Sequence, residues 1–359
     1  TGYVSVLQTN QTEYVWQTTG YTRPASEDLV IYELLARDFS ENDDYQTVID
    51  SLDYLAGLGI NAIQFMPIME FQGNDSWGYN PTYFMALDKA YGTKDKFKEL
   101  VDACHARGIA VILDIALNHA HESFPYCWMW FNTNGGFAPS ADNPYFNVTA
   151  KHPFNVFFDF NHESALTKQY VDDVNKYWLE EYKVDGYRFD LSKGFTQRQS
   201  SDVGAWNAYD QGRVDILTRM YNEIRNVDAT AYVILEHLGD NDEETVLANT
   251  GMMPWGIMHS QFKDNVLGFA GNTNVSGLYH ENRGWNFPNL VGYMESHDEE
   301  RLIFDAINSG NSNGSYSVRN LGTALQRKAA ANAIMYAVPG PKMLWQFGEL
   351  GYDVSINQT

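Results

Sequence analysis

Two acidic side chains stand at the ends of short apolar segments of the chain. Asp190 closes the segment Gly-Tyr-Arg-Phe-Asp that begins at Gly186, and Glu236 directly follows the apolar residues 232–235. Hydrolysis of a glycosidic bond requires two carboxyl groups, one that protonates the leaving oxygen and one that attacks the sugar or activates water. Residue type and position therefore make Asp190 and Glu236 candidates for such a pair.

The neighbours of the two acids favour different roles for them. Arg188 lies two positions before Asp190, so in a β-strand both side chains point to the same face. A guanidinium at that place favours the ionised carboxylate that a nucleophile needs, although a structural Arg–Asp ion pair is an alternative. Glu236 follows an apolar run, and apolar surroundings raise the pKa of a carboxyl group, as suits a general acid. Taken by itself, a Glu at the end of a strand is more often structural.

Two further segments carry polar residues after apolar runs. Residues 295–301 contain His297 and Asp298, which are suited to binding sugar hydroxyls, and residues 114–119 end in Asn118 and His119. Each segment alone is as well explained by a solvated acidic loop or a structural histidine. Only the combination with the first two acids makes the signal specific.

A regular series of elements has to position these residues. From Leu29 onward, short β-rich runs alternate with amphipathic helices, such as the helix that Thr93 caps and Gly108 stops. Eight such strands predict an α/β fold, a (β/α)8 barrel of the TIM type, in which chemistry takes place at the C-terminal ends of the strands. The predicted strands cover residues 29–35, 60–66, 109–114, 184–190, 232–236, 256–262, 290–294 and 341–347.

The pattern divides the chain into three parts. Residues 1–27 are predicted to be the remnant of an N-terminal β segment and a linker, with short strands near residues 4–7 and 14–16. Residues 28–359 form the catalytic barrel, and residues 119–162 form a small inserted subdomain after the third strand. Because no helix pattern follows the eighth strand, we expect a truncated piece of a longer protein, without the last barrel helix or any C-terminal domain.

Composition excludes several classes of protein. The 359 residues carry a formal net charge of -22, which argues against binding to nucleic acid. No apolar run reaches the roughly 18 residues that a membrane span needs. The two cysteines, Cys104 and Cys127, are expected to be buried thiols rather than a disulfide. Aromatic residues make up 14% of the chain, and most of them are expected to pack the core.

The four segments together resemble the α-amylase family of glycoside hydrolases (glycoside hydrolase family 13), whose short sequence blocks fall at the ends of strands three, four, five and seven in this order. The resemblance extends from about residue 30 to 352. It implies a retaining hydrolase that cleaves α-1,4-glucosidic bonds in starch, glycogen or maltooligosaccharides. It further implies that Asp190 is the nucleophile, supported by Arg188, that Glu236 is the general acid/base, and that Asp298 is the third acid, which grips the sugar.

The resemblance also implies roles in binding. His297, His119 and Lys193 match positions that contact substrate, and Tyr79, within Trp-Gly-Tyr-Asn-Pro at residues 77–81, matches a tyrosine that stacks on the sugar in the cleavage subsite. Calcium is the expected metal, with Asn118 and Asp159 as ligands, since calcium favours carboxylate and amide oxygens. For Asp159, capping of the helix that starts near residue 164 is an equally good interpretation. No organic cofactor is expected.

The sequence departs from the family at two places. Gly194 follows Lys193 where amylases commonly have Lys-His, and Ser296 precedes His297 where they usually have Asn. Serine at that position also occurs in branching enzymes, so an α-glucan transferase or branching enzyme is an alternative, as is an inactive glucan-binding barrel. We expect a monomer, located outside the cell or in the periplasm. Because the sequence begins at Thr1 without a signal peptide, we expect it to be processed or trimmed.

Overall fold

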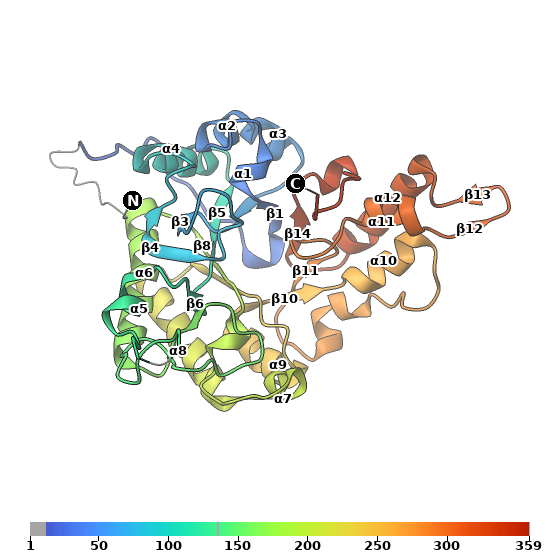
Figure 1. The fold of residues 1–359 in the computed structure, drawn as a ribbon. Helices are drawn as coiled ribbons and strands as arrows, with labels where there is room; N and C mark the ends of the chain where they lie inside the picture. Colours follow the sequence, from blue (N-terminus) through green and yellow to red (C-terminus); the bar gives the residue numbers. More distant parts are fainter. Residues whose placement is uncertain (1–11, 135, 359) are drawn as a thin grey trace.

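Eight parallel strands close into a barrel in the computed structural model, which describes residues 12–134 and 136–358 (Figure 1). The order around the barrel is β1-β2-β5-β8-β9-β10-β11-β14, so consecutive barrel strands of the chain are neighbours in space. This confirms the predicted (β/α)8 barrel. The barrel strands are β1 (Val30–Leu34), β2 (Ala62–Phe65), β5 (Ala110–Ile115), β8 (Gly186–Phe189), β9 (Tyr232–Leu235), β10 (Met253–Ile257), β11 (Val291–Tyr293) and β14 (Lys342–Trp345).

Side chains alternate between the inside and the outside of the barrel because successive residues of a strand point to opposite faces. In β1, Ile31 packs with the apolar residues of the barrel interior, whereas Tyr32 and Leu34 pack with the cluster that contains the surrounding helices. The same alternation turns every second residue of β5, β8 and β9 inward. Polar residues near the C-terminal ends of these strands are therefore aimed at one common region.

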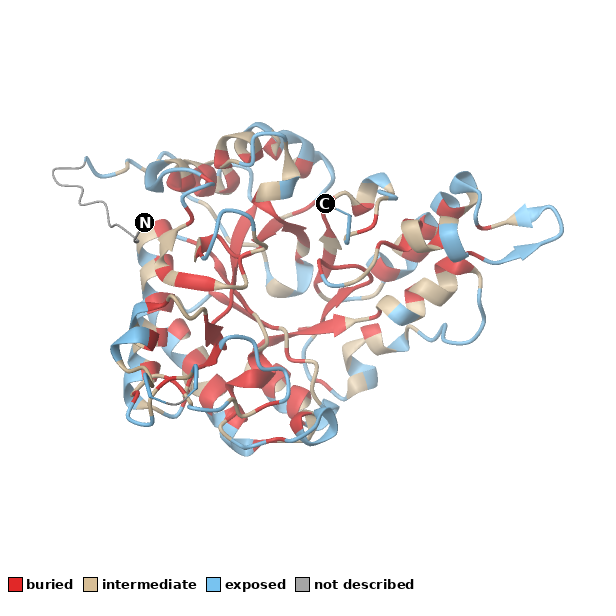
Figure 2. Ribbon diagram, in the orientation of Figure 1, coloured by how far each residue is buried: buried red, intermediate tan, exposed pale blue. Residues whose placement is uncertain are grey.

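Helices cover the outside of the barrel, and the buried residues concentrate on the strands and on the helix faces turned toward them (Figure 2). Thr93 caps α4 as predicted, since its Oγ1 accepts a hydrogen bond from the Lys96 amide at 3.2 Å. The longer helices are α4 (Lys94–His105), α6 (Ala165–Tyr182), α8 (Gln211–Val227), α9 (Asn241–Thr250), α10 (His259–Leu267), α11 (Leu302–Ser309) and α12 (Leu321–Ala337). The short ones are α1 (Ala36–Phe39), α2 (Tyr45–Asp50), α3 (Leu52–Gly57), α5 (Pro125–Met129) and α7 (Val203–Asn207).

Two long connections at the C-terminal ends of the strands carry structure of their own. After β2, the antiparallel pair β3 (Met69–Phe71) and β4 (Pro81–Leu87) encloses the loop that contains Tyr79. After β5, the antiparallel pair β6 (His119–Ala120) and β7 (Phe158–Asp159) bounds most of the segment 119–162, which was predicted to be an insert. A further hairpin, β12 (Ser312–Asn313) and β13 (Tyr316–Ser317), projects from the barrel between α11 and α12 (Figure 1).

Two sequence predictions were wrong in detail. The sixth strand was placed at residues 256–262, but β10 ends at Ile257 and α10 starts at His259. Met253 and Pro254, which precede the predicted strand, pair with Ile234 and Leu235 of β9 and so begin β10. Residues 14–16 are not a strand; the Gln17 and Thr18 amides instead donate to the Asp102 carboxylate of α4, at 2.7 and 2.8 Å.

Other predictions concern residues 4–7, the cysteines and membrane spans. Residues 4–7 lie outside the described residues. Cys104 and Cys127 are buried free thiols, as expected. Within residues 12–134 and 136–358, the chain has no helix that is long and apolar enough to cross a membrane.

Candidate active site

One buried guanidinium connects three carboxyl groups at the C-terminal end of the barrel. Arg188 Nη1 donates to both oxygens of Asp114, at 2.8 and 2.9 Å, and to Oδ1 of Asp190, at 2.9 Å. Arg188 Nη2 donates to Oε2 of Glu236 at 2.9 Å. The two acids that the sequence pairs, 46 positions apart, are thus attached to the two terminal nitrogens of a single side chain.

The position of Arg188 follows from the alternation of β8. Its neighbours Tyr187 and Phe189 face the outer core, so the arginine side chain points into the barrel and is completely buried. The β5–β8 register sets Arg188 opposite Asp114, and the face of the Trp255 ring lies 4.2 Å from the guanidinium carbon. A buried cation is costly unless it is paired and hydrogen-bonded. Here the carboxylates pair with both terminal nitrogens and the indole ring covers the guanidinium, while Nε has no hydrogen-bond partner within the described residues.

Burial sets the protonation of the two central acids. Reinforced by the charge of Asp114, it raises the pKa of Asp190 to about 6 in spite of Arg188. Reinforced by the charge of Asp190, it raises the pKa of Glu236 to about 7, again in spite of Arg188. The guanidinium favours the carboxylate of Asp190, as the sequence predicted, but burial is the larger effect. Between these two pKa values, Asp190 is mostly ionised and Glu236 mostly holds its proton.

Tyr79 lies against the same cluster. Its hydroxyl donates to Oδ2 of Asp114 at 2.8 Å, and its ring stacks on His297 with ring centres 5.0 Å apart and planes at 20°. The loop reaches this place through Gly78, whose φ of +94° and close approach to the backbone of Pro67 leave no space for a Cβ. The structure therefore brings Tyr79 together with His297 and the Asp114–Arg188 pair.

The two histidines differ in charge. Burial lowers the pKa of His119 to about 4, so its ring is neutral and its Nε2–H donates to the Tyr79 carbonyl at 2.8 Å. For His297, burial also acts to lower the pKa, but the charge of Glu33 and a hydrogen bond to it outweigh burial and raise the pKa to about 9. His297 is consequently a cation at neutral pH.

Two predicted site residues lie at the margin of this cluster. Asp298 has an exposed side chain, and its Oδ1 lies 3.5 Å from His297 Nε2. Lys193 is held away from the acids by its own partners, Asn207 Oδ1 at 2.6 Å and the Leu238 carbonyl at 2.8 Å, with the Trp206 ring beneath its ammonium group. Its role in substrate binding stays a prediction.

Asp114 was not predicted to have a role in the site. The structure makes it a central member of the cluster, since it accepts from both Arg188 and Tyr79. Burial raises its pKa to about 6, against the attraction of Arg188. The available signal was a charged residue in the otherwise apolar run of residues 109–115, where only a paired carboxylate is tolerated.

The residues predicted to bind calcium lie on adjoining segments, since Asn118 directly precedes β6 and Asp159 is in β7, which pairs with β6. The buried Oδ1 atoms of Asn118 and Asp159 have no hydrogen-bond partner within the described part of the chain, and the same holds for both ring nitrogens of His152. His152 Nε2 is 3.4 Å from Asp159 Oδ1. A Cβ built on Gly194 would fall 2.0 Å from Asn118 Oδ1 and 2.9 Å from His152 Nε2, so these atoms converge beside Gly194. Sequence reasoning did not single out His152 as a ligand.

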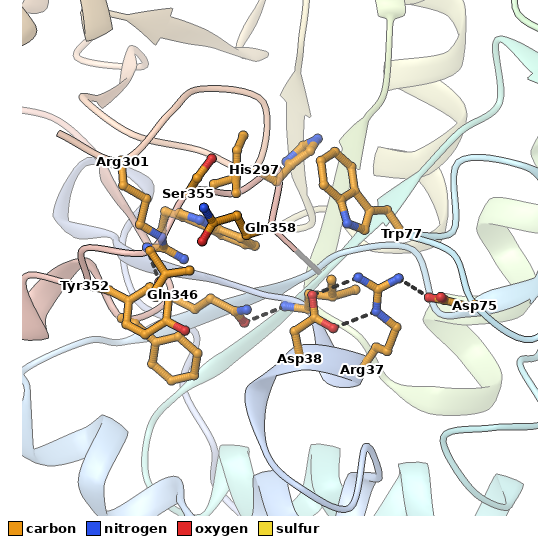
Figure 3. A pocket seen from close by; sticks show the side chains of 15 residues that line it. Arg37, Asp38, Asp75, Trp77, His297, Arg301, Gln346, Tyr352, Ser355 and Gln358 are labelled. Atoms are coloured by element: carbon orange, nitrogen blue, oxygen red, sulfur yellow. Dashed lines mark hydrogen bonds and ion pairs between the residues drawn. The ribbon is translucent and has the colours of Figure 1, made fainter. Parts of the chain in front are cut away.

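A cavity of about 460 Å³ opens beside this cluster (Figure 3). Trp77 and His297 form part of its wall, and Arg37 and Asp38 lie opposite. Residues 345–358, from the last residue of β14 onward, supply most of the remaining lining. Its mixed aromatic and charged wall suits a ligand that offers both ring faces and hydroxyl groups.

Comparison with known proteins finds similarity to α-amylases, a trehalohydrolase and a pullulanase. A family model for the catalytic domain of α-amylases matches residues 33–157. Malto-oligosyltrehalose trehalohydrolase from Saccharolobus solfataricus is 33% identical over 190 residues, which are 53% of this chain and 31% of the relative. Alpha-amylase 3 from Dictyoglomus thermophilum is 23% identical over 371 residues, covering 94% of this chain and 66% of the relative. The solved structure of pullulanase type I from Bacillus subtilis, complexed with maltose, has a TM-score of 0.73, with 20% identity, and covers 98% of this chain and 54% of that chain.

The closed parallel barrel, with its group of acids at the C-terminal ends of the strands, has the fold of the solved pullulanase structure. The chain is thus similar to the catalytic domain of α-amylases over the residues that the family model matches. It spans from about a third to two thirds of the length of the two curated relatives named above.

Proposed function

We propose that this chain is a retaining glycosidase that cleaves α-1,4-glucosidic bonds in starch, glycogen or maltooligosaccharides. The observation that supports the proposal best is the attachment of Asp190 and Glu236 to the two terminal nitrogens of Arg188. Two carboxyl groups with separate protonation are what a retaining reaction needs.

In the proposed reaction, the Asp190 carboxylate attacks the anomeric carbon while Glu236 gives its proton to the leaving glycosidic oxygen. This step produces a glycosyl ester on Asp190 and leaves Glu236 ionised. Glu236 then takes a proton from water, the resulting hydroxide attacks the anomeric carbon, and Asp190 departs as a carboxylate. Arg188 supports both ionised forms, because its guanidinium donates to each acid.

The product configuration tests this proposal. Proton NMR of a maltooligosaccharide digest should show the α-anomer as the first product, because two displacements restore the configuration. Appearance of the β-anomer first would contradict a retaining mechanism. An increase in reducing ends with soluble starch supports hydrolysis, whereas a change in iodine staining without new reducing ends would favour the transferase alternative. The Asp190→Asn variant, which lacks the nucleophile, is the blank for both assays.

We further propose that Asn118 and Asp159 hold a calcium ion. The support is chemical: two buried oxygens, one from an amide and one from a carboxylate, have no partner among the described residues, and calcium prefers such oxygens. The ion would link β7 of the 119–162 segment to the loop after β5, next to His119. Its contribution would be structural, fixing the wall of the site. His152, whose ring nitrogens are also unpaired, would line this place.

A further inference from the structure

Glu33 is a charged residue in the middle of the apolar strand β1. Its side chain points into the barrel, as does that of Ile31 two positions earlier, and it is completely buried. The β1–β2 register sets it opposite Gln64, whose Nε2 lies 3.5 Å from Glu33 Oε1. A buried carboxylate is tolerated only when it is well paired. Neither the family resemblance nor the proposed reaction gives this residue a role.

Both carboxylate oxygens of Glu33 accept hydrogen bonds from the same residue, His297. Oε1 accepts from the ring Nδ1 of His297 at 2.8 Å, and Oε2 accepts from the backbone amide of His297 at 3.1 Å. Glu33 thus fixes the position of the His297 main chain as well as the orientation of its ring. The ring is further confined by Tyr79, which stacks on it, and by Trp77, whose ring plane stands at 84° to it.

The hydrogen bond at Nδ1 determines what Nε2 can do. An ionised carboxylate only accepts, so Nδ1 must carry a proton. In a neutral imidazole this would leave Nε2 as an acceptor without a proton. Nε2 points away from Glu33, toward the side on which Asp298 Oδ1 lies at 3.5 Å. His297 can therefore donate from Nε2 toward the site only as the imidazolium.

We infer that Glu33 is a positioning residue that keeps His297 as an imidazolium, so that its Nε2–H donates to a hydroxyl of the sugar in the cleavage subsite. This inference rests on the proposed function for the identity of the ligand. The pairing itself concerns the free protein. Glu33 acts through His297 and does not touch the sugar.

The other charges around His297 are consistent with this assignment. Its carboxylate neighbours Glu33 and Asp298 favour the imidazolium, whereas burial and the positive charge of Arg188 oppose it. The imidazolium in turn opposes the rise that burial causes in the pKa of Asp114, Asp190 and Glu299. By holding this cation in place, Glu33 also favours the ionised form of the proposed nucleophile.

The protonation of His297 can be observed directly by NMR of protein labelled with ¹⁵N-histidine, with His297→Asn used to assign the signal. In the unmodified protein at pH 7, both ring nitrogens should carry protons, and the ring should titrate near pH 9. In Glu33→Gln the charge is lost while the shape is kept, so His297 should titrate at about 6.5 or lower, the range of a histidine without an anionic partner. A matched control is Glu295→Gln: Glu295 is another buried carboxylate, which binds Lys328 and the Leu302 amide instead, and this change should leave the His297 titration in place.

The pH dependence of activity is a second test, because a merely structural role of Glu33 would not change it. The ratio of kcat/KM for Glu33→Gln to that of the unmodified enzyme should be near one at about pH 5 and should fall about tenfold or more by about pH 8, as His297 loses its charge and its donor at Nε2. A ratio that is equally low at every pH would overturn the inference. So would a neutral His297 at pH 7 in the unmodified protein, a result that remains accessible if Glu33→Gln does not fold. Because the NMR titration needs no substrate, it separates a failure of this inference from a failure of the proposed function.

Discussion

Arg188 donates hydrogen bonds of 2.9 Å to both Asp190 and Glu236, one from each terminal nitrogen of its guanidinium. The side chain that supports the nucleophile in the sequence analysis is therefore shared with the proposed acid/base. Its charge opposes the effect of burial on both carboxyl groups, and it fixes their relative position. Because the two acids lie at the same guanidinium, the ionisation of one depends on that of the other: the negative charge of one carboxylate raises the pKa of the other.

Asp190→Asn is expected to reduce kcat by about 1,000-fold or more, because asparagine can still accept from Arg188 but is a very poor nucleophile. The melting temperature should not fall, since the change removes a charge that is repelled by Asp114. Kinetics on a maltooligosaccharide and thermal melting by circular dichroism check both expectations. Asp215→Asn, an exposed acid on α8 bonded to Gln211, is the matched control and should retain full activity. Substantial activity in the Asp190 variant would show that another group attacks the sugar.

The pH profile of kcat/KM should be a narrow bell. The acid limb reflects ionisation of Asp190 near pH 6 and the alkaline limb reflects loss of the Glu236 proton near pH 7. Initial rates across this range check the profile; a broad plateau up to about pH 9 would contradict it.

Glu236→Gln should make the protein more resistant to heat at alkaline pH. Because the pKa of Glu236 is raised in the folded state, from 4.5 to about 7, the folded protein binds more protons than the unfolded chain between these values. The stability that this provides is complete below about pH 4.5 and is lost as the pH rises through 7. The variant should match the unmodified protein in melting temperature at acid pH and exceed it at about pH 8. Equal melting temperatures at pH 8 would mean that Glu236 carries no burial penalty.

Tyr79→Ala and Tyr79→Phe separate stacking from hydrogen bonding. Loss of the ring should raise KM about fivefold, if stacking on a sugar contributes as much as stacking between aromatic rings. Phenylalanine keeps the ring and should leave KM near its normal value, while the loss of the bond to Asp114 should shift the pH profile. Steady-state kinetics on short maltooligosaccharides check both variants. Normal kinetics combined with a lower melting temperature in Tyr79→Ala would indicate that the ring only packs the loop.

Removal of calcium should destabilise the protein if Asn118 and Asp159 bind the ion. A ligand that binds only the folded state raises its stability, so a chelator should lower the melting temperature and added calcium should restore it. In Asn118→Ala this response should be lost. Asn226→Ala, on the exposed side of α8, serves as the control and should respond to the chelator like the unmodified protein. A melting temperature that is insensitive to the chelator would argue against the site.

The sequence alone determined the barrel and the acids at its strand ends. Strands and amphipathic helices are recognisable because the spacing of apolar residues along the chain differs between them. The short blocks around Asp190, Glu236 and His297 are recognisable because each is continuous in the chain. Boundaries were less secure: the sixth strand was predicted at residues 256–262, but β10 covers residues 253–257, because Met253 and Pro254 pair with β9.

Tertiary structure alone decided the partners of these residues. The pairing of Glu33 with His297 joins positions 264 apart, and the attachment of Asp114 to Arg188 joins positions 74 apart. Glu33 and Asp114 were recognisable in the sequence as charged residues within apolar strands, but their partners, His297 and Arg188, were not. Which buried charges meet depends on strand register and on the closure of the barrel, and these long-range properties leave no local signal at either residue.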